Sequence, residues 1–214
     1  MPKTKLKKFS QYETFPNTYD ARNLLKGKWH QEVFKNNNPI VLELACGRGE
    51  YCIGLAQLNP NKNFIGLDVK AARMWEGAKY AIENHLNNVA FLRIQIDFLL
   101  DYFEAGEIDE IWITFPDPQP QKPRAKQRLT HIKFLEKYFL LLGKFKSVNL
   151  KTDSDFLFQF TTESVKDINV QIQELLFNID DKEDLQDELK ISTYYEKMWR
   201  EKNIPIKYLK FQFV

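Results

Sequence analysis

The residues best suited to chemistry follow an apolar segment in the middle of the chain. Residues 111–115 (IWITF) are apolar at nearly every position, as in a buried strand, and Pro116-Asp117-Pro118 comes next. Each proline fixes its own φ and biases the preceding residue towards extended backbone, so Asp117 is held at the strand end. A basic run follows, made of Lys122, Arg124, Lys126 and Arg128. A fixed carboxylate beside a basic run indicates chemistry on a polyanion. The alternative is a solvated loop leaving the core.

A glycine turn earlier in the chain indicates a nucleotide-type ligand. Residues 40–44 predict a short strand, 45–49 (ACGRG) a tight turn and 50–58 a helix. A dinucleotide-binding turn has the spacing G-x-G-x-x-G and binds a pyrophosphate. Here no third glycine follows, and the strand carries a carboxylate, which suits a cationic ligand. The pattern is similar to the first motif of S-adenosylmethionine methyltransferases, with alanine in place of the first glycine, and consists of Glu43, Ala45, Gly47 and Gly49.

Acidic residues also end the next two expected strands, 63–69 and 88–95. Asp68 lies about 20 residues after the glycine turn, where an acid binds ribose hydroxyls in such folds. Asp97 follows the third strand, where methyltransferases of this architecture often place an acid or amide at the adenine amino group. At both positions a helix N-cap is the competing interpretation.

The remaining periodicity predicts strands alternating with helices. Helices are expected at 71–85, 98–103, 129–142, 154–166 and 193–202, and further strands at 107–115, 145–150, 170–177 and 206–213. Such alternation is typical of a doubly wound α/β fold. We therefore expect a mostly parallel, seven-stranded sheet with one antiparallel strand near the C-terminus.

Composition limits the function classes. A chain of 214 residues suffices for one α/β domain, and 43% hydrophobic residues argue against wholesale disorder. The net charge is only +2, so a nucleic-acid surface must be local. Cys46 and Cys52, with three histidines, give neither a disulfide framework nor a zinc spacing, which indicates a reducing, cytoplasmic setting and no metal. No apolar run approaches the length of a membrane span.

The first 37 residues lack clear periodicity and form a basic, aromatic arm ahead of a single expected domain at 38–214. Lysines interleaved with Phe9, Tyr12 and Trp29 could contact RNA. Packing of these aromatic side chains on the domain is favoured instead, with the first eight residues mobile.

Three segments together resemble the bacterial tRNA (guanine-N7)-methyltransferase family. They are Pro116-Asp117-Pro118 with its basic tail, Lys151-Thr152-Asp153 and Thr193-Tyr194-Tyr195-Glu196, and the resemblance extends from about residue 40 to the C-terminus. It implies a Rossmann-like methyltransferase fold, S-adenosylmethionine as methyl donor and N7 of a tRNA guanine, in the variable loop, as acceptor. It leaves open whether the protein is a monomer or a homodimer.

The resemblance also assigns roles to individual residues. It implies cofactor binding by Glu43, Ala45, Gly47, Gly49, Asp68, Asp97 and Asp117, and a catalytic role for Asp117. It implies tRNA or guanine contacts by Gln121 or Lys122, Asp153, Thr193, Tyr194, Tyr195 and Glu196, while the basic residues Arg124, Lys126 and Arg128 are expected to contact RNA phosphates. The chain departs from the family at Gln119 and Gln121, where tryptophan and lysine are usual, and Lys122 lies one position later.

The sequence is also compatible with three other classes of protein. A small-molecule or protein methyltransferase would bind the cofactor but not RNA, and the basic run after Asp117 disfavours it. A nicotinamide-dependent oxidoreductase is disfavoured by the missing third glycine and by Glu43. An RNA-binding module with a vestigial cofactor site is disfavoured because every strand-end acid is retained.

Overall fold

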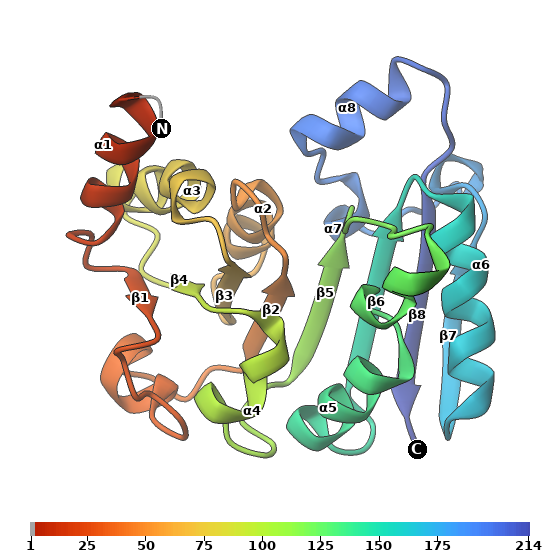
Figure 1. The fold of residues 1–214 in the computed structure, drawn as a ribbon, viewed down its shortest axis with the longest axis horizontal. Coiled ribbons are helices and arrows are strands. Elements are labelled where there is room, and N and C mark those ends of the chain that lie inside the picture. The colour runs from red at the N-terminus through yellow and green to blue at the C-terminus, as the bar shows by residue number, and fades with distance from the viewer. Residues whose placement is uncertain (1–2) are drawn as a thin grey trace.

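The fold is an α/β sheet with helices on both faces, seen in a computed structural model that describes residues 3–214 (Figure 1). Eight strands form one sheet in the order β1-β4-β3-β2-β5-β6-β8-β7. Their bounds are β1 Thr18–Asp20, β2 Ile40–Leu44, β3 Asn63–Asp68, β4 Val89–Arg93, β5 Glu110–Thr114, β6 Ser147–Thr152, β7 Val170–Leu176 and β8 Lys207–Phe213. Among the strands of residues 3–214, only β8 pairs antiparallel, and its neighbours are β6 and β7.

Helical segments connect the strands. The α-helices are α1 Lys3–Tyr12, α2 Glu50–Leu58, α3 Ala71–Glu83, α4 Leu99–Tyr102, α5 Ile132–Leu142, α6 Asp155–Ser164, α7 Asp187–Lys190 and α8 Tyr194–Arg200. A π-helix, η1, spans Trp29–Phe34, and short 3-10 turns are η2 Ile96–Phe98, η3 Lys122–Gln127, η4 Val165–Asp167 and η5 Ile179–Asp181.

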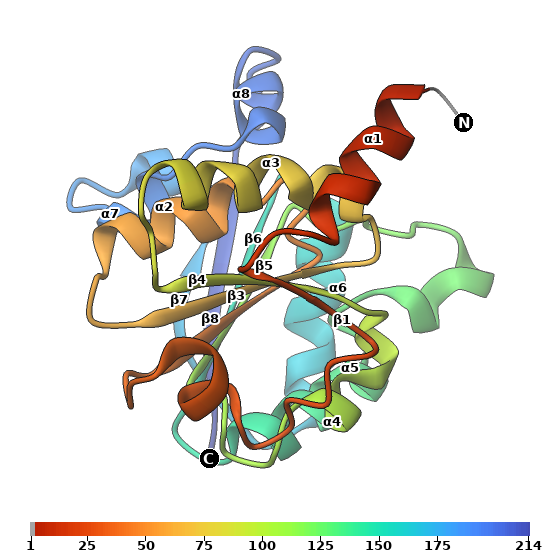
Figure 2. The same cartoon turned by 90° about the vertical axis from the view of Figure 1, so that its left-hand side faces the viewer.

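The sheet separates two apolar cores, and side-chain alternation along the strands decides which residue enters which core. In β2, Ile40, Leu42 and Leu44 point to the face covered by η1, α4, α5 and α6, while Val41 points to the face covered by α1, α2, α3 and α7. Figure 2 shows these helices above and below the strands. Glu43 alternates with Leu42 and Leu44 and so lies on the α2 side.

The direction of chain winding reverses at β2. The chain runs from β2 outward through β3 to β4, then returns to place β5 on the other side of β2 and continues to β6. Loops after β2 and β5 therefore leave the sheet in opposite directions, which opens a crevice at the carboxyl ends of the strands. Figure 1 shows α8 standing over this edge.

The sheet has eight strands, so the expected seven is wrong by one. The additional strand, β1, comes from the N-terminal arm and pairs parallel with β4. A strand of three residues is too short to give a periodic pattern, which is why the sequence does not reveal it. The expected single antiparallel strand near the C-terminus is confirmed as β8.

Aromatic side chains attach the arm to the rest of the chain. Tyr12 and Trp29 are buried, and the Tyr12 hydroxyl donates to the Phe91 carbonyl at 3.2 Å. Met1 and Pro2, which belong to the segment expected to be mobile, lie outside the described residues. Within residues 3–214, no helix combines the length and apolarity needed to cross a membrane.

Candidate active site

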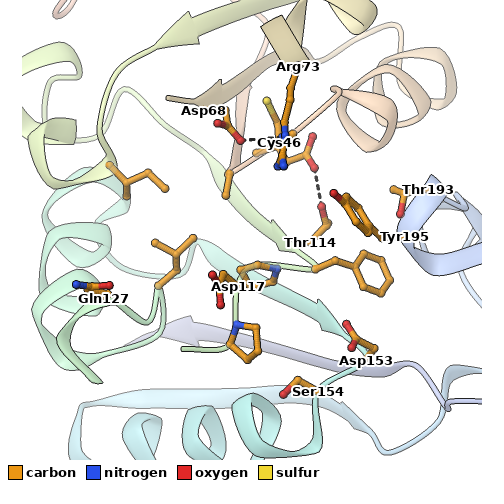
Figure 3. A pocket seen from close by; sticks show the side chains of 18 of the residues that line it. Cys46, Asp68, Arg73, Thr114, Asp117, Gln127, Asp153, Ser154, Thr193 and Tyr195 are labelled. Carbon is orange, nitrogen blue, oxygen red and sulfur yellow. Dashed lines mark hydrogen bonds between the residues drawn. The ribbon is translucent and has the colours of Figure 1, made fainter. Parts of the chain in front are cut away.

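A cavity of about 1620 Å³ occupies the crevice at the carboxyl ends of β2, β3, β5 and β6. It is one continuous space with the glycine turn at one end and the proline-flanked turn at the other. Figure 3 shows Asp68, Asp117, Asp153 and Tyr195 around it, contributed by four separate segments of the chain. All of the acids expected at strand ends line it, namely Glu43, Asp68, Asp97, Asp117 and Asp153.

Glu43 is the most unusual acid in this cavity. Its side chain is 2% exposed, and Oε1 accepts a hydrogen bond from the Thr114 hydroxyl of the neighbouring strand at 2.6 Å. Oε2 is buried and has no partner among the described residues. Burial raises the pKa of Glu43 from 4.5 to about 8, and this rise is only partly opposed by the Thr114 hydrogen bond and by the backbone N–H of Cys52 in the first turn of α2. A buried acceptor without a donor is costly, so Oε2 is suited to a ligand that brings one.

The glycine turn leaves room for a ligand beside Glu43. Ala45 and Gly47 both have positive φ, of 57° and 58°, and both line the cavity. A Cβ on Gly47 would meet nothing within 4 Å, so this side of the turn is open. Gly49 has a different reason to be glycine, because a Cβ there would lie 2.5 Å from the Phe91 ring. Of the three, Gly49 is the one placed for packing and not for contact with a ligand.

Asp68 is fixed by backbone groups on both sides. Its Oδ2 accepts from the Gly47 N–H at 3.1 Å and its Oδ1 from the Lys70 N–H at 2.9 Å. The carboxylate thus joins the end of β3 to the glycine turn, and each oxygen keeps a lone pair for ribose hydroxyls. The N-cap interpretation does not fit, because the helix α3 is capped at Lys70 without a side-chain hydrogen bond.

Asp97 lines the cavity after β4, but its carboxylate is paired. Lys133 of α5 donates to Oδ1, and Lys137 donates to the Asp97 carbonyl. These two lysines were not predicted, since they lie in a helix whose pattern only indicates packing. Lys133 itself lines the cavity.

Asp117 is held as the flanking prolines predict. Its Oδ1 accepts from the Gln119 N–H at 3.1 Å, which closes a tight turn, and the side chain is exposed to the cavity. Phe115 and Gln119 have φ of 47° and 45°, a region that costs an ordinary residue about 1 kcal/mol or more. Strained backbone on both sides of one carboxylate indicates a position fixed for function.

The opposite wall of the cavity is built by the β6–α6 turn and by α8. Asp153 lines it, and partial burial raises the pKa of its carboxyl. Thr193 caps α8 through its hydroxyl, which accepts from the Glu196 N–H at 3.2 Å, and Tyr195 lines the cavity. Tyr194 points to the glycine turn instead, with the Arg48 guanidinium 4.8 Å from its ring and its N–H on Glu50 at 3.0 Å.

Glu196 is not placed to contact a guanine. The side chain is 1% exposed, and its two oxygens accept from Lys151 at 2.7 Å and from Arg200 at 3.0 Å. Lys151 is itself fully buried and also donates to the carbonyls of Leu189 and Ile191. The expected base contact is therefore replaced by a buried ion pair that attaches α8 to the end of β6.

A structural role of Glu196 in this ion pair can be distinguished by experiment from a role in contacting the substrate. Glu196→Gln removes the charge and leaves a carbonyl oxygen for one of the two cations, so we expect the free energy of unfolding to fall by about 2 kcal/mol. Urea unfolding followed by circular dichroism measures it. A variant of unchanged stability but with a much higher KM for RNA would restore Glu196 as a substrate contact.

The basic run divides into exposed and buried members. Gln121, Lys122 and Arg124 are exposed, at or near the start of η3. Lys126, near the end of η3, is also exposed and lines the cavity. Arg128 is 6% exposed, with its guanidinium over the rings of two phenylalanines of α6. The expected phosphate contact by Arg128 is therefore wrong, because packing removes that side chain from solvent.

The cavity is also lined by two basic residues that the sequence analysis does not predict. Lys70, the N-cap residue of α3, and Arg73, in the first turn of this helix, both line it. Their only signal is their position just after Asp68, where a side chain at a helix start faces the strand edge. Within residues 3–214 no group of three or more His, Cys, Asp or Glu could hold a metal ion.

These features define a class of protein: an S-adenosylmethionine-dependent methyltransferase of the Rossmann-like type. The fold agrees with solved structures, since the 16S rRNA methyltransferase KamB superposes with a TM-score of 0.65 at 12% identity over 87% of this chain and 93% of that one. A SAM-dependent methyltransferase from Aquifex aeolicus gives a TM-score of 0.58 at 12% identity over 96% and 98%.

Sequence comparison identifies the family. A family model described as "Putative methyltransferase" matches residues 37–209. Curated tRNA (guanine-N(7)-)-methyltransferases from Bacteroides fragilis and Cytophaga hutchinsonii are each 42% identical, over 99% and 100% of this chain and 86% and 99% of their own lengths. The chain belongs to the tRNA (guanine-N(7)-)-methyltransferase family.

S-adenosylmethionine is the methyl donor of this family, and the residues present fit it. The unpartnered Glu43 Oε2 suits the ammonium group, and Asp68 suits the ribose hydroxyls. The open side of Gly47 leaves space next to both. Asp97 follows β4, at the position expected for the adenine contact, and lines the same cavity.

Proposed function

We propose that the cavity binds S-adenosylmethionine beside Glu43 and Asp68 and a tRNA guanine beside Asp117 and Asp153, and that N7 of a guanine in the variable loop receives the methyl group. The observation that supports this most strongly is that one continuous cavity contains both sets of acids. A cofactor-binding module alone would not need the second set.

Methyl transfer to guanine N7 requires few chemical functions from the protein. Guanine N7 carries an in-plane lone pair and no proton, so it needs no general base. The bound cofactor supplies an electrophilic methyl group on a sulfonium. The protein's contribution is therefore to align the base and to stabilise the positive charge that develops on it. N7 is on the Hoogsteen edge, which is accessible in loops of folded RNA.

The Asp117 side chain can both align the base and stabilise the positive charge that develops on it. Its carboxyl group is fixed by its turn and open to the cavity. Its carboxylate can accept hydrogen bonds from guanine N1–H and the exocyclic amino group, and it opposes the charge of the methylated base. Asp153 on the facing wall offers a second acceptor, and Tyr195 offers a ring for stacking against the base.

The reaction is tested with purified protein, tritiated S-adenosylmethionine and unmodified tRNA. Nucleoside mass spectrometry after digestion should show N7-methylguanosine, and mapping of RNase fragments should place it in the variable loop. Label at another atom or in another RNA class, or no label, would overturn the proposal.

The exposed basic residues should carry the salt dependence of RNA binding. Changing Lys122, Arg124 and Lys126 together to glutamine removes three cations, so the slope of log Kd against log salt should become shallower by about 2. Filter binding of tRNA between low and moderate salt measures it. Lys144→Gln, at an exposed lysine between α5 and β6 outside the cavity, should leave the slope unchanged.

We further propose a cytoplasmic site of action, since tRNA is modified there in bacteria and since Cys46 and Cys52 are both free thiols. A protein of this kind can act as a monomer or a homodimer, and sedimentation at micromolar concentration distinguishes the two.

A further inference from the structure

Arg128 has contacts that no phosphate-binding role explains. Its Nε donates to the Gln119 carbonyl at 3.0 Å, and its guanidinium lies 4.6 Å from the Phe156 ring and 4.4 Å from the Phe160 ring. No carboxylate pairs with it among the described residues. A buried cation is costly unless its surroundings compensate for lost water. Here two ring faces and one carbonyl provide that compensation.

The carbonyl that Arg128 holds belongs to the turn that fixes the acid. Gln119 donates its N–H to Asp117 Oδ1 at 3.1 Å while its carbonyl accepts from Arg128 at 3.0 Å. Gln119 is also in the left-handed region, at φ 45°, so its peptide orientation needs support from outside the turn. Two hydrogen bonds thus connect the guanidinium to the carboxylate through a single residue.

The other side of Arg128 is connected to the facing wall of the cavity. Phe156 and Phe160 are one helical turn apart on α6, which is why their rings can enclose one guanidinium. The same helix begins two residues after Asp153, and the intervening Ser154 caps it by accepting from the Leu157 N–H at 3.2 Å. Arg128 therefore joins the Asp117 turn to the element that carries Asp153.

We propose that Arg128 is a positioning residue that sets the place of the Asp117 carboxylate relative to Asp153 by holding the Gln119 peptide against α6. It acts through Gln119 and touches neither base nor phosphate. Lysine cannot replace it fully, because only a planar guanidinium stacks between two rings while pointing one N–H at a carbonyl. The catalytic part of this inference rests on the proposed function; the structural part does not.

The test compares Arg128→Lys and Arg128→Met with Lys144→Met in the full chain. In steady-state assays we expect kcat to fall between about tenfold and a hundredfold in the Arg128 variants, because a small misplacement of a catalytic group costs this much. In an Asp117→Asn background the same changes should cost less than about threefold, since no carboxylate is left to position. The salt slope of tRNA binding should not change.

An activity-independent readout separates this proposal from the assignment of function. Exchange of the Gln119 amide proton, followed by NMR, should accelerate at least about tenfold in both Arg128 variants and not in Lys144→Met. Unchanged exchange would overturn the proposal even if tRNA is methylated; faster exchange with no methylation of tRNA by the wild type would overturn the proposed function alone. Equal losses of kcat in both backgrounds would show a general structural role instead. A salt slope of tRNA binding that is shallower by about 1 would show that Arg128 contacts an RNA phosphate. If Arg128→Met fails to fold, the lysine variant carries the same comparison.

Discussion

Asp117→Asn should lower kcat for tRNA methylation by about 10²- to 10³-fold. Asparagine has nearly the same shape and can still accept the Gln119 N–H that closes the turn, so the backbone should stay in place. What is lost is the negative charge facing the base. Removing one preorganised electrostatic group from an active site typically costs this much. The cost arises in the transition state, where positive charge develops on the guanine, so KM for tRNA should change far less than kcat.

Steady-state transfer of tritiated methyl to tRNA at varied tRNA concentration measures kcat and KM, and calorimetry measures the cofactor affinity separately. Asp167→Asn is a matched control, because Asp167 is an exposed carboxylate in η4 that does not line the cavity. If Asp117→Asn kept more than about a third of wild-type turnover, the carboxylate would not be the group that stabilises the transition state.

The sequence was sufficient to predict the central sheet, since β2 to β8 each carry a local pattern, although the alternation is only partial in β7 and β8. It also predicted which acids gather at one edge, because the carboxyl ends of parallel strands meet there and Glu43, Asp68 and Asp117 each follow or end such a strand. The local stiffness of Asp117 was likewise visible, since its two prolines are part of the sequence itself. Each of these inferences needs only neighbouring residues.

What could not be predicted depends on contacts between distant segments. Lys151 and Glu196 are 45 positions apart, and nothing near either residue indicates a buried pair. Arg128 belongs to a run whose other members are exposed, and only the packing of α6 distinguishes it from them. A basic or acidic side chain next to a site therefore has two possible roles, contact with the ligand or support of the wall, and tertiary burial decides between them.

The raised pKa of Glu43 predicts that the free energy of unfolding falls as pH rises, whereas a carboxylate with a lowered pKa would make it rise. In the ligand-free fold its pKa is raised to about 8, so it holds a proton that the unfolded chain loses above its ordinary pKa of 4.5. Between these values the folded state binds more protons than the unfolded state, and the free energy of unfolding falls as pH rises. The total loss of unfolding free energy across this window is about 5 kcal/mol, and Glu43→Gln should abolish it.

The ligand-free protein favours the protonated form of Glu43, and the ammonium group of S-adenosylmethionine should instead favour the ionised form. A cation donating to Oε2 favours the ionised carboxylate, so binding near pH 6.5 should release close to one proton from Glu43. Calorimetry in two buffers of different ionisation enthalpy measures the proton count, and urea unfolding from pH 5 to 8 measures the stability slope with and without cofactor. In Glu43→Gln the proton release should vanish and the affinity should no longer rise with pH. Binding without proton release in the wild type would mean either that Glu43 is already ionised or that it does not contact the ammonium group. A stability slope that is steep in the ligand-free wild type and is lost in Glu43→Gln excludes the first of these, because the difference between the two slopes isolates the proton held by Glu43.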